Sequence, residues 1–402
     1  MTDTLSSDFP STREEAQLRL EAFLSAADGY AAKRNHVVPG HPHVSRLSPA
    51  TRTRLLLETE ICEAARERFS PHEIEKFEQE VWWRLYWKGW LEQRPSVWTR
   101  YREDLAELEW SERAEQVAAG ESGVAILDLF AKELVETGYL HNHARMWWAA
   151  FWIHVEKLPW QLGADFFFRH LLDGDAASNT LSWRWVAGLH TKGKSYLVRR
   201  SNLEKYVDSD LLSVHEDGLS RLEGTAAIEL PFVEHPEIVK VTETPLPETL
   251  PARTGIWIHD EDLRVEDSPL AGTSPAAIGT FAPLDLWENE GYPEKKRRFL
   301  LSALRDGATR AEKHFGVLSA FEESDVWIDA LVSWSRRNGL EALLTMKPMV
   351  GPLADRWHEA EQELDRSGTR LIGLLRDHDV AVFSKATAGF FGFWKKTASL
   401  RC

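Results

Sequence analysis

Apolar residues recur at three- and four-residue spacing through the first half of the chain, which predicts helices rather than strands. Between residues 50 and 185 almost no stretch alternates apolar and polar residues as a half-buried strand does. The helical spacing is clear at 15–27, 55–69 and 126–136. We therefore expect an all-helical domain over residues 16–224.

The pattern changes after residue 224. Residues 228–253 contain five prolines and many Glu and Thr without a helical period, which is typical of an extended linker. We assign residues 225–252 to this linker. Beyond it, short apolar runs alternate with amphipathic helical patterns, which predicts a doubly wound parallel sheet of Rossmann-like type over residues 253–402. The expected strands are 255–259, 340–346 and 380–383, and the expected helices are 295–315, 326–338 and 352–367. The fold class is therefore α + α/β.

Composition restricts the function classes. With 402 residues the chain can form two domains, and its formal net charge of −15 means that any contact with DNA needs a local basic patch. Cys62 and Cys402 alone cannot form a disulfide framework, and no run is long or apolar enough for a membrane span or a leader peptide. We expect a cytoplasmic protein without a metal site. The 18 Trp favour stacking or electron transfer, because a buried indole N–H needs a partner.

Several short motifs carry chemistry. Ser-Arg-Leu-Ser-Pro at 45–49 can open a helix whose free N–H groups hold a pyrophosphate. Asp-Gly-Asp at 173–175 is followed by Asn179 and by Trp-Arg-Trp at 183–185, and His-Asn-His-Ala-Arg-Met precedes them at 141–146. The stretch 188–195 also matches the phosphate-loop pattern, but such a loop follows a buried strand and none is expected there, so an ATPase is disfavoured.

In order and approximate spacing, these motifs resemble the flavin domain of the DNA photolyase and cryptochrome family. The resemblance implies FAD as cofactor, with an ion pair between Arg145 and Asp173 beside the ring system. An arginine there would stabilise a reduced, anionic flavin by its charge. Asn179 would face flavin N5. The implied cofactor-binding residues are Tyr30, Ser45, Arg46, Leu47, Ser48, Arg145, Asp173, Asp175 and Asn179.

The resemblance also implies an electron relay. Trp183 and Trp160 match the inner and middle members of the family's tryptophan chain. The usual outermost position aligns with the acidic segment 101–110, where either Trp110 or Tyr101 could take that role, or the electron route could differ.

A third set resembles the lesion pocket of the enzymes that repair cyclobutane pyrimidine dimers, which flip the dimer out of the duplex. Its members are Glu80, Trp83, Asn142, Met146 and Trp185. Burial in an apolar cavity would raise the pKa of Glu80, so that it could donate a hydrogen bond to a thymine carbonyl. The candidate DNA-facing residues are Arg34, Arg84, His143, Lys192 and Lys194, with Arg199 and Arg200 extending the basic rim.

The implied activity is light-driven repair of cyclobutane pyrimidine dimers in DNA, which makes the protein a carbon–carbon lyase. The alternative is a cryptochrome-like blue-light sensor that signals to a protein partner without repair. The negative net charge and the thin basic rim favour the sensor, whereas the complete lesion-pocket set favours repair. An interaction module without FAD is a third possibility.

The second half resembles the light-harvesting α/β domain of the same family. Asp262-Leu263-Arg264 follows its expected first strand, and Gly-Phe-Trp-Lys at 392–395 resembles the motif that closes that domain. In ordinary members this domain comes first, so the chain is expected to be circularly permuted. A generic Rossmann-like domain is the alternative. Because residues 346–355 do not reproduce the family's acidic folate contact, we do not expect a second, antenna chromophore.

Overall fold

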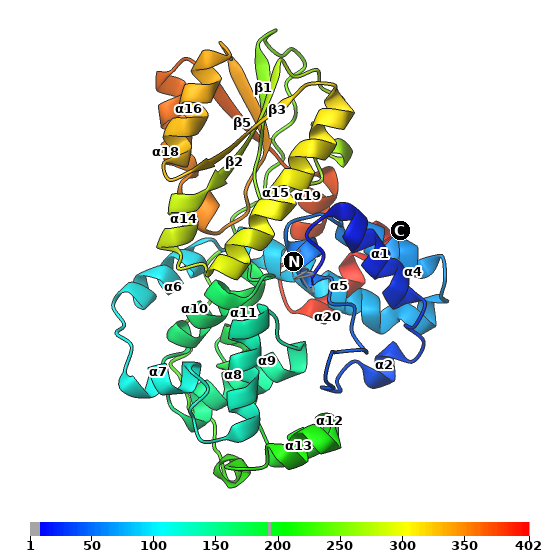
Figure 1. The fold of residues 1–402 in the computed structure, drawn as a ribbon, viewed down its shortest axis with the longest axis vertical. Coiled ribbons are helices and arrows are strands. Elements are labelled where there is room, and N and C mark those ends of the chain that lie inside the picture. The colour runs from blue at the N-terminus through cyan, green and yellow to red at the C-terminus, as the bar shows by residue number, and fades with distance from the viewer. Residues whose placement is uncertain (1–8, 192–193, 402) are drawn as a thin grey trace, which may run out of the picture.

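The computed structural model describes residues 9–191 and 194–401 (Figure 1). A helical part, drawn below, adjoins a second part that is built around a parallel sheet. The helices of the first part are α1 (Arg13–Leu24), α2 (Tyr30–Lys33), α3 (Ser48–Arg52), α4 (Glu58–Arg66), α5 (Pro71–Glu92), α6 (Ser96–Ala106), α7 (Glu112–Ala118), α8 (Ala125–Thr137), α9 (Asn142–Ala150), α10 (Trp160–His170), α11 (Ala176–Val186), α12 (Arg200–Tyr206) and α13 (Ser209–Val214).

The central helix of the first part is α5. It begins at a capping box in which the Glu73 carboxylate accepts from the Ser70 backbone N–H at 2.9 Å, and Pro71 occupies the first turn, where its missing N–H costs nothing. Helices α2, α4 and α11 pack against it. Gly89 is required in the middle of α5, because a Cβ there would lie 2.7 Å from the Cα of Phe383.

Five parallel strands form the sheet in the order β3-β2-β1-β4-β5. The strands are β1 (Thr254–Ile258), β2 (Ala277–Pro283), β3 (Ser319–Ser324), β4 (Ala342–Met346) and β5 (Arg370–Leu374). Every residue of β1, β2 and β4 is buried, as expected for a parallel sheet that is covered on both faces. Helix α15 (Glu294–Phe315) lies on one face, and α16 (Trp327–Arg337) and α18 (Trp357–Arg366) lie on the other (Figure 1). The parallel sheet predicted from the sequence is confirmed.

Two predicted elements were wrong. Residues 380–383 belong to a helix, α19 (Asp377–Phe383), and not to a strand. The short apolar run fits either element, but Asp377 and Asp379 in the first turn favour a helix start through the helix dipole. The predicted helix at 352–367 is broken at Arg356 into α17 (Pro352–Asp355) and α18. Short helix α14 (Leu284–Asn289) follows β2 directly.

The chain returns to the helical part after the sheet. Both α19 and α20 (Phe390–Lys396) pack against α5 (Figure 1). Residues 223–253, all of them described, contain no helix or strand. Among the described residues no helix combines the length and the apolar character needed to cross a membrane.

Buried ion pairs join the two parts. Arg54 of the helical part bonds to Asp262 at 3.0 Å and to Asp379 at 2.7 Å, and Arg376 bonds to Asp262 at 2.7 Å. Burial would raise the pKa of Asp262, but Arg376 and Arg54 lower it far below its ordinary value. The junction is thus held from within by paired charges.

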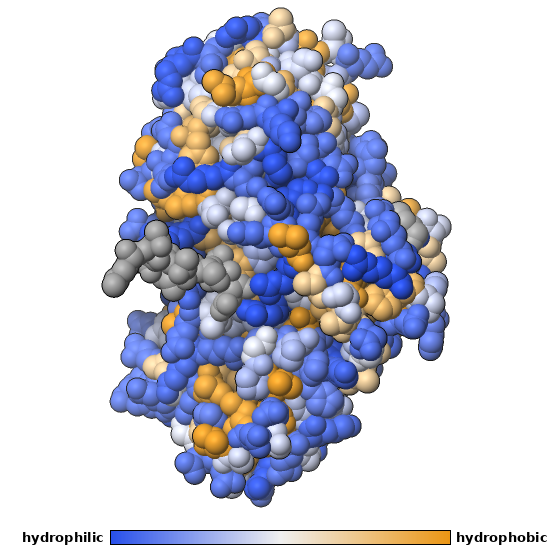
Figure 2. Space-filling model, turned by 45° about the vertical axis from the view of Figure 1, so that its right-hand side comes forward, coloured by the Kyte–Doolittle hydropathy of each residue, from blue (hydrophilic) through white to orange (hydrophobic). Residues whose placement is uncertain are grey.

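Polar residues predominate on the face shown in Figure 2, where apolar residues form scattered patches.

Candidate functional site

The ion pair between Arg145 and Asp173 forms as expected. Arg145 on α9 donates from Nη1 to Oδ1 at 3.0 Å and from Nη2 to Oδ2 at 2.8 Å, while its Nε donates to the Leu140 carbonyl at 2.7 Å. Asp173 is buried in the turn between α10 and α11. Burial would lower the pKa of Arg145, but Asp173 raises it. The guanidinium is therefore a fixed cation in a partly buried position.

Tyr139 connects this pair to the loop at 45–48. Its ring centroid lies 5.4 Å from the Arg145 guanidinium and 5.9 Å from that of Arg46. In that loop the Ser45 hydroxyl accepts from the Leu47 N–H at 3.4 Å, and Ser48 begins α3 with Pro49 behind it. Sequence reasoning missed Tyr139, although its position just before the His-Asn-His run could have indicated it. The loop and the Arg145 pair thus belong to one region.

The start of α11 carries the other predicted cofactor residues. Asp175 caps the helix by accepting from the Ser178 N–H at 2.9 Å. It also pairs with Arg84, which keeps its pKa below the ordinary value despite burial. The Asn179 amide is buried and donates to the Ala164 carbonyl at 2.7 Å. These side chains are therefore held rigidly by protein contacts.

The donor set of this region fits a flavin dinucleotide. Two guanidiniums, of Arg145 and Arg46, suit phosphate groups and an anionic ring. Within the described residues, three buried polar atoms near these groups have no hydrogen-bond partner: Ser178 Oγ, His41 Nδ1 and His141 Nε2. Because buried polar atoms normally have partners, a bound polar molecule would satisfy them. Tyr30 is also buried here, on α2, and its ring meets Phe77 edge-on at 5.4 Å.

Glu80 and Arg34, predicted for different roles, pair with each other. Arg34 Nη1 donates to Glu80 Oε1 at 2.5 Å. The next residue, Asn35, accepts at its carbonyl from His143 Nδ1 at 2.9 Å, so this segment bridges α5 and α9. Burial raises the pKa of Glu80 and Arg34 opposes that shift, so the expected direction is confirmed. Asn142, which was predicted for the same lesion pocket as Glu80, is exposed at the start of α9.

Trp83 contacts aromatic residues of its own helix and of a segment distant in the sequence. Phe390 of α20 stacks on it with ring centroids 3.9 Å apart, and Tyr86 meets it edge-on at 5.4 Å. Sequence reasoning missed Phe390, because only three-dimensional contact places it here. Trp185 on α11 is half-buried beside Tyr196 at 5.7 Å. Since α11 packs against both α5 and α9, the helices that carry Trp83, Met146 and Trp185 adjoin one another.

Fewer of the predicted DNA-facing residues are exposed in the structure than the sequence led us to expect. Arg84 lies in the interior, where it bonds to Glu58 at 3.0 Å and to Asp175, and its placement at the rim was wrong. His143 is buried against Trp147, so that placement was wrong too. Both were misplaced because their partners lie on other elements. Lys194 and Arg199 are exposed, Arg200 pairs with Glu204 and Glu223, and Lys192 lies outside the described residues.

A row of tryptophans leads from Trp183 to the surface. Its ring lies 6.2 Å from that of Trp148, Trp148 stacks on Trp152 at 5.2 Å, and Trp152 meets Trp110 at 5.9 Å. Trp110 is partly exposed. Sequence reasoning missed Trp148 and Trp152, although both lie in the Trp-rich stretch after Met146.

Trp160 belongs to a second aromatic group. It stacks on Tyr101 at 5.4 Å, and both rings are buried. Among the described residues no ring contact joins Trp183 to Trp160. The row that ends at Trp110 therefore reaches solvent through ring contacts, whereas Trp160 contacts a buried ring.

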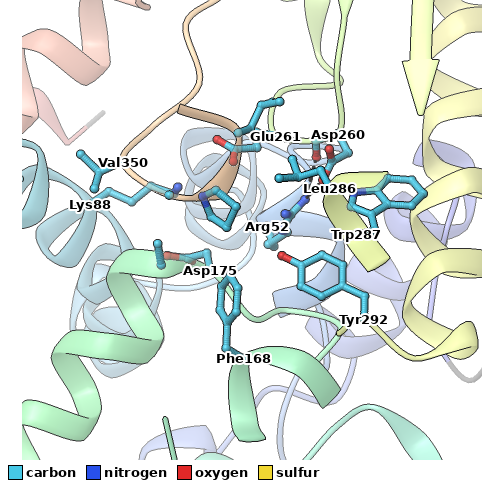
Figure 3. A pocket seen from close by; sticks show the side chains of 14 residues that line it. Arg52, Lys88, Phe168, Asp175, Asp260, Glu261, Leu286, Trp287, Tyr292 and Val350 are labelled. Atoms are coloured by element: carbon cyan, nitrogen blue, oxygen red, sulfur yellow. Dashed lines mark hydrogen bonds and ion pairs between the residues drawn. The ribbon is translucent and has the colours of Figure 1, made fainter. Parts of the chain in front are cut away.

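A small charged pocket lies where the two parts meet (Figure 3). Arg52 donates to Asp260 at 2.5 Å, and Figure 3 shows Lys88, Glu261 and Tyr292 turned toward the same space. Asp175 lines this pocket as well. It therefore connects the start of α11 with the loop after β1.

The phosphate-loop pattern at 188–195 follows α11, a helix, and not a strand. Its residues 192–193 lie outside the described residues. The structural context that such a loop needs is therefore missing before Gly188.

Comparisons with known proteins agree on one family. Residues 77–210 match the FAD binding domain of DNA photolyase. The chain is 30% identical over 201 residues to the deoxyribodipyrimidine photo-lyase of Neurospora crassa, covering 47% of this chain and 32% of that protein. It is 34% identical over 151 residues to the enzyme of Streptomyces griseus, covering 37% and 32%. The chain thus spans about a third of the length of these relatives.

Two solved structures show a weaker likeness. A class III photolyase from Agrobacterium tumefaciens has a TM-score of 0.45 at 24% identity, covering 51% of this chain and 44% of that one. A cryptochrome from Synechocystis has a TM-score of 0.44 at 22% identity, covering 52% and 45%. The resemblance to the family rests on the sequence matches, whose segment contains the Arg145–Asp173 pair and the start of α11. Residues 77–210 of this chain are therefore similar to the FAD binding domain of DNA photolyase.

Proposed function

We propose that this protein binds FAD and uses light to split cyclobutane pyrimidine dimers in DNA. The observation that carries the proposal is the junction of α5, α9 and α11, which brings the Arg145–Asp173 pair and the helix bearing Glu80 and Trp83 into one packed unit. When bound and reduced, FAD supplies an electron to the dimer under illumination.

The chain's own residues have two tasks toward the cofactor. The Arg145 cation, fixed by Asp173, favours a negatively charged ring system by Coulomb attraction in a partly buried position. The loop at 45–48 supplies hydroxyl groups and backbone N–H groups that suit a pyrophosphate. The proposal is supported by the Ser178 hydroxyl, which lies next to Asn179 in the chain. It is buried and has no hydrogen-bond partner among the described residues.

The lesion pocket needs flat apolar walls and a few polar groups. Trp83 and Trp185 supply the walls, while Met146 and Asn142 come from the helix between them in the chain. Arg34 binds Oε1 of Glu80, which leaves Oε2 for a pyrimidine carbonyl. Because burial raises the pKa of Glu80, its carboxyl group retains a proton to higher pH than an exposed one would, and can donate it in a hydrogen bond.

A sensor without repair activity is the second candidate. It is favoured by the net charge of −15 and by the interior positions of Arg84 and His143, which remove one cation and one imidazole from the proposed DNA face. Lys194 and Arg199 remain as exposed cations. Phosphate contacts of this kind position DNA without reading its sequence.

A defined oligonucleotide that contains one thymine dimer distinguishes the two candidates. The purified protein, with its flavin chemically reduced, is mixed with this DNA and illuminated with blue light. Repair predicts that dimers disappear in the light and persist in the dark. In the E80A variant, repair should be slower at unchanged flavin content, because Ala removes the group that donates a hydrogen bond to the pyrimidine carbonyl. Dimers that persist in the light with fully reduced flavin would support the sensor.

We also propose that the part with the sheet is the family's light-harvesting domain in a permuted position. Support comes from Asp262, which follows β1 and pairs with Arg54 across the junction and with Arg376 within its own part. The chain order is helical part first and sheet second. A gene rearranged to place residues 253–401 before residue 16 should yield a folded protein with the same flavin content. Failure of that protein to bind flavin would contradict the proposal.

A further inference from the structure

A groove crosses the helical part on the side of Trp160. It has a volume of about 880 Å³ and lies between α6, the turn at 157–161, the end of α11 and the extended segment at 228–236. We call it the Trp160 groove. Of the residues assigned above to cofactor, lesion or electron relay, only Trp160 lines it. Its volume falls in the range of sites that bind small organic molecules.

The floor of the Trp160 groove carries a cation without a counterion. Arg184 lies in α11 with its guanidinium 5.9 Å from the centroid of the Trp160 ring. Within the described residues Arg184 has no ion pair, and its Nε is buried without a hydrogen-bond partner. Burial lowers the pKa of Arg184 to about 10, so the side chain is still charged at neutral pH. A half-buried, unpaired guanidinium is costly, and a bound anion would remove that cost.

The acid that acts on this cation, Asp104, does not neutralise it. Asp104 of α6 lies on the groove rim, where it accepts a hydrogen bond from Gln161 at 3.4 Å. It raises the pKa of Arg184 less than burial lowers it, and Arg100 opposes it. The charged groups facing the groove are Arg100, Glu103, Asp104, Lys157, Arg184 and Glu234. With three acids and three bases, this rim does not attract a polyanion such as DNA.

The walls are apolar. Leu158, Leu189 and Leu230 line the groove together with Pro231 and the edge of Trp160. An inorganic anion would contact Arg184 but would leave these side chains facing water. The walls therefore suit a ligand with a flat hydrocarbon body, whereas the planar guanidinium fork suits a carboxylate.

We infer that the Trp160 groove binds a small aromatic carboxylate, with its carboxylate on Arg184 and its ring between Trp160 and the leucines of the wall. This inference is independent of the proposed repair activity. It assigns the extended segment at 228–236 a role as one wall of a ligand site.

The inference is tested by calorimetric titration of the purified, flavin-containing protein with 2-naphthoate. Its uncharged analogue 2-naphthamide and inorganic phosphate serve as comparison probes. We expect 2-naphthoate to bind at least about 10-fold more tightly than either, because the amide loses the charge-assisted pair with Arg184 and phosphate loses the apolar contacts with the walls. Equal affinity for the amide, or no binding of 2-naphthoate, would overturn the inference.

Variants locate the binding within the groove. R184Q should weaken 2-naphthoate binding by about 10-fold or more, while R100Q, which removes an exposed cation from the rim, should change it little. L230S tests the wall and should also weaken binding without altering the helical circular dichroism signal. Unchanged affinity in both R184Q and L230S would place the ligand elsewhere and refute the assignment.

Discussion

Phe390 lies face to face on Trp83, with ring centroids 3.9 Å apart and the ring planes within 9° of parallel. Trp83 belongs to α5 in the first part of the chain, whereas Phe390 begins α20 after the sheet. The segment that follows the sheet therefore supports the side chain that we propose to stack on the lesion. One face of the indole is fixed by the protein, and fixing it lowers the entropy lost when a flat ligand binds.

The first prediction concerns this stack. F390A should lower the free energy of unfolding by about 3–5 kcal/mol, the usual cost of truncating a buried Phe, and should raise KM for dimer-containing DNA more than it lowers kcat. F391A is the control, because Phe391 is 66% exposed and should change stability by less than about 0.5 kcal/mol. Urea unfolding measures both variants. Equal losses in F390A and F391A would contradict a specific role of the stack.

The second prediction concerns flavin retention. R145Q leaves Asp173 as an unpaired buried carboxylate and removes the fixed cation, so the purified variant should contain much less flavin than the wild type. R113Q is a control for losing a two-bonded arginine pair: Arg113 binds Glu156 at 2.7 and 2.9 Å, and Glu156 keeps Arg221 as a second partner. The ratio of flavin absorbance to protein gives the result. Full flavin content in R145Q would show that the pair is only structural.

The sequence predicts those features that depend on local pattern. The amphipathic spacing at 295–315 corresponds to α15, and the apolar run at 340–346 corresponds to β4. The Arg145–Asp173 pair was also predictable, because both residues lie in motifs that resemble those of one protein family in order and spacing. Such motifs can be recognised without knowing how the other segments pack.

Features that depend on distant contacts were not predictable in this way. Val380 to Phe383 could form a strand or a helix, and the first turn of the helix that forms is held by Arg54, which bonds to Asp379 from 325 residues away. From the sequence, Arg84 was predicted to be a surface cation. Its ion pairs with Glu58 and Asp175, which lie on other elements, place it in the interior. The stack of Phe390 on Trp83 likewise needs the chain to return to α5.

The third prediction concerns electron transfer. If the row Trp183, Trp148, Trp152 and Trp110 carries electrons from the surface, W152F should strongly slow the light-driven reduction of the bound flavin. Phe has no accessible one-electron oxidation of this kind but fills most of the same space. Transient absorption of the tryptophan radical should show loss of the long-lived species in W152F and W110F.

W160F compares the two aromatic groups, since Trp160 contacts Tyr101 and not Trp183 among the described rings. W357F is the control for a remote indole in the sheet part. Slow reduction in W160F with normal reduction in W152F would assign the relay to Trp160 instead.

The fourth prediction is a pH dependence of stability at the end of α5. Glu92 Oε1 accepts from the Val350 N–H at 2.5 Å, and burial raises the pKa of Glu92 to about 6 from the ordinary 4.5. A raised carboxyl pKa means that the folded protein binds the proton more tightly than the unfolded chain. Stability is therefore greatest below pH 4.5 for this group and falls as the pH rises to about 6.

E92Q removes this ionisation and keeps an acceptor for Val350. At pH 8 it should raise the free energy of unfolding by about 1–2 kcal/mol over the wild type, whereas the two proteins should agree at pH 4.5. E92A is the control: it leaves the Val350 N–H without its partner and should be less stable than E92Q at every pH. Urea titrations of the three proteins from pH 4.5 to 8 measure the differences. A constant offset between wild type and E92Q across that range would mean that Glu92 does not titrate in it, and that the contact between α5 and the sheet part is insensitive to protonation.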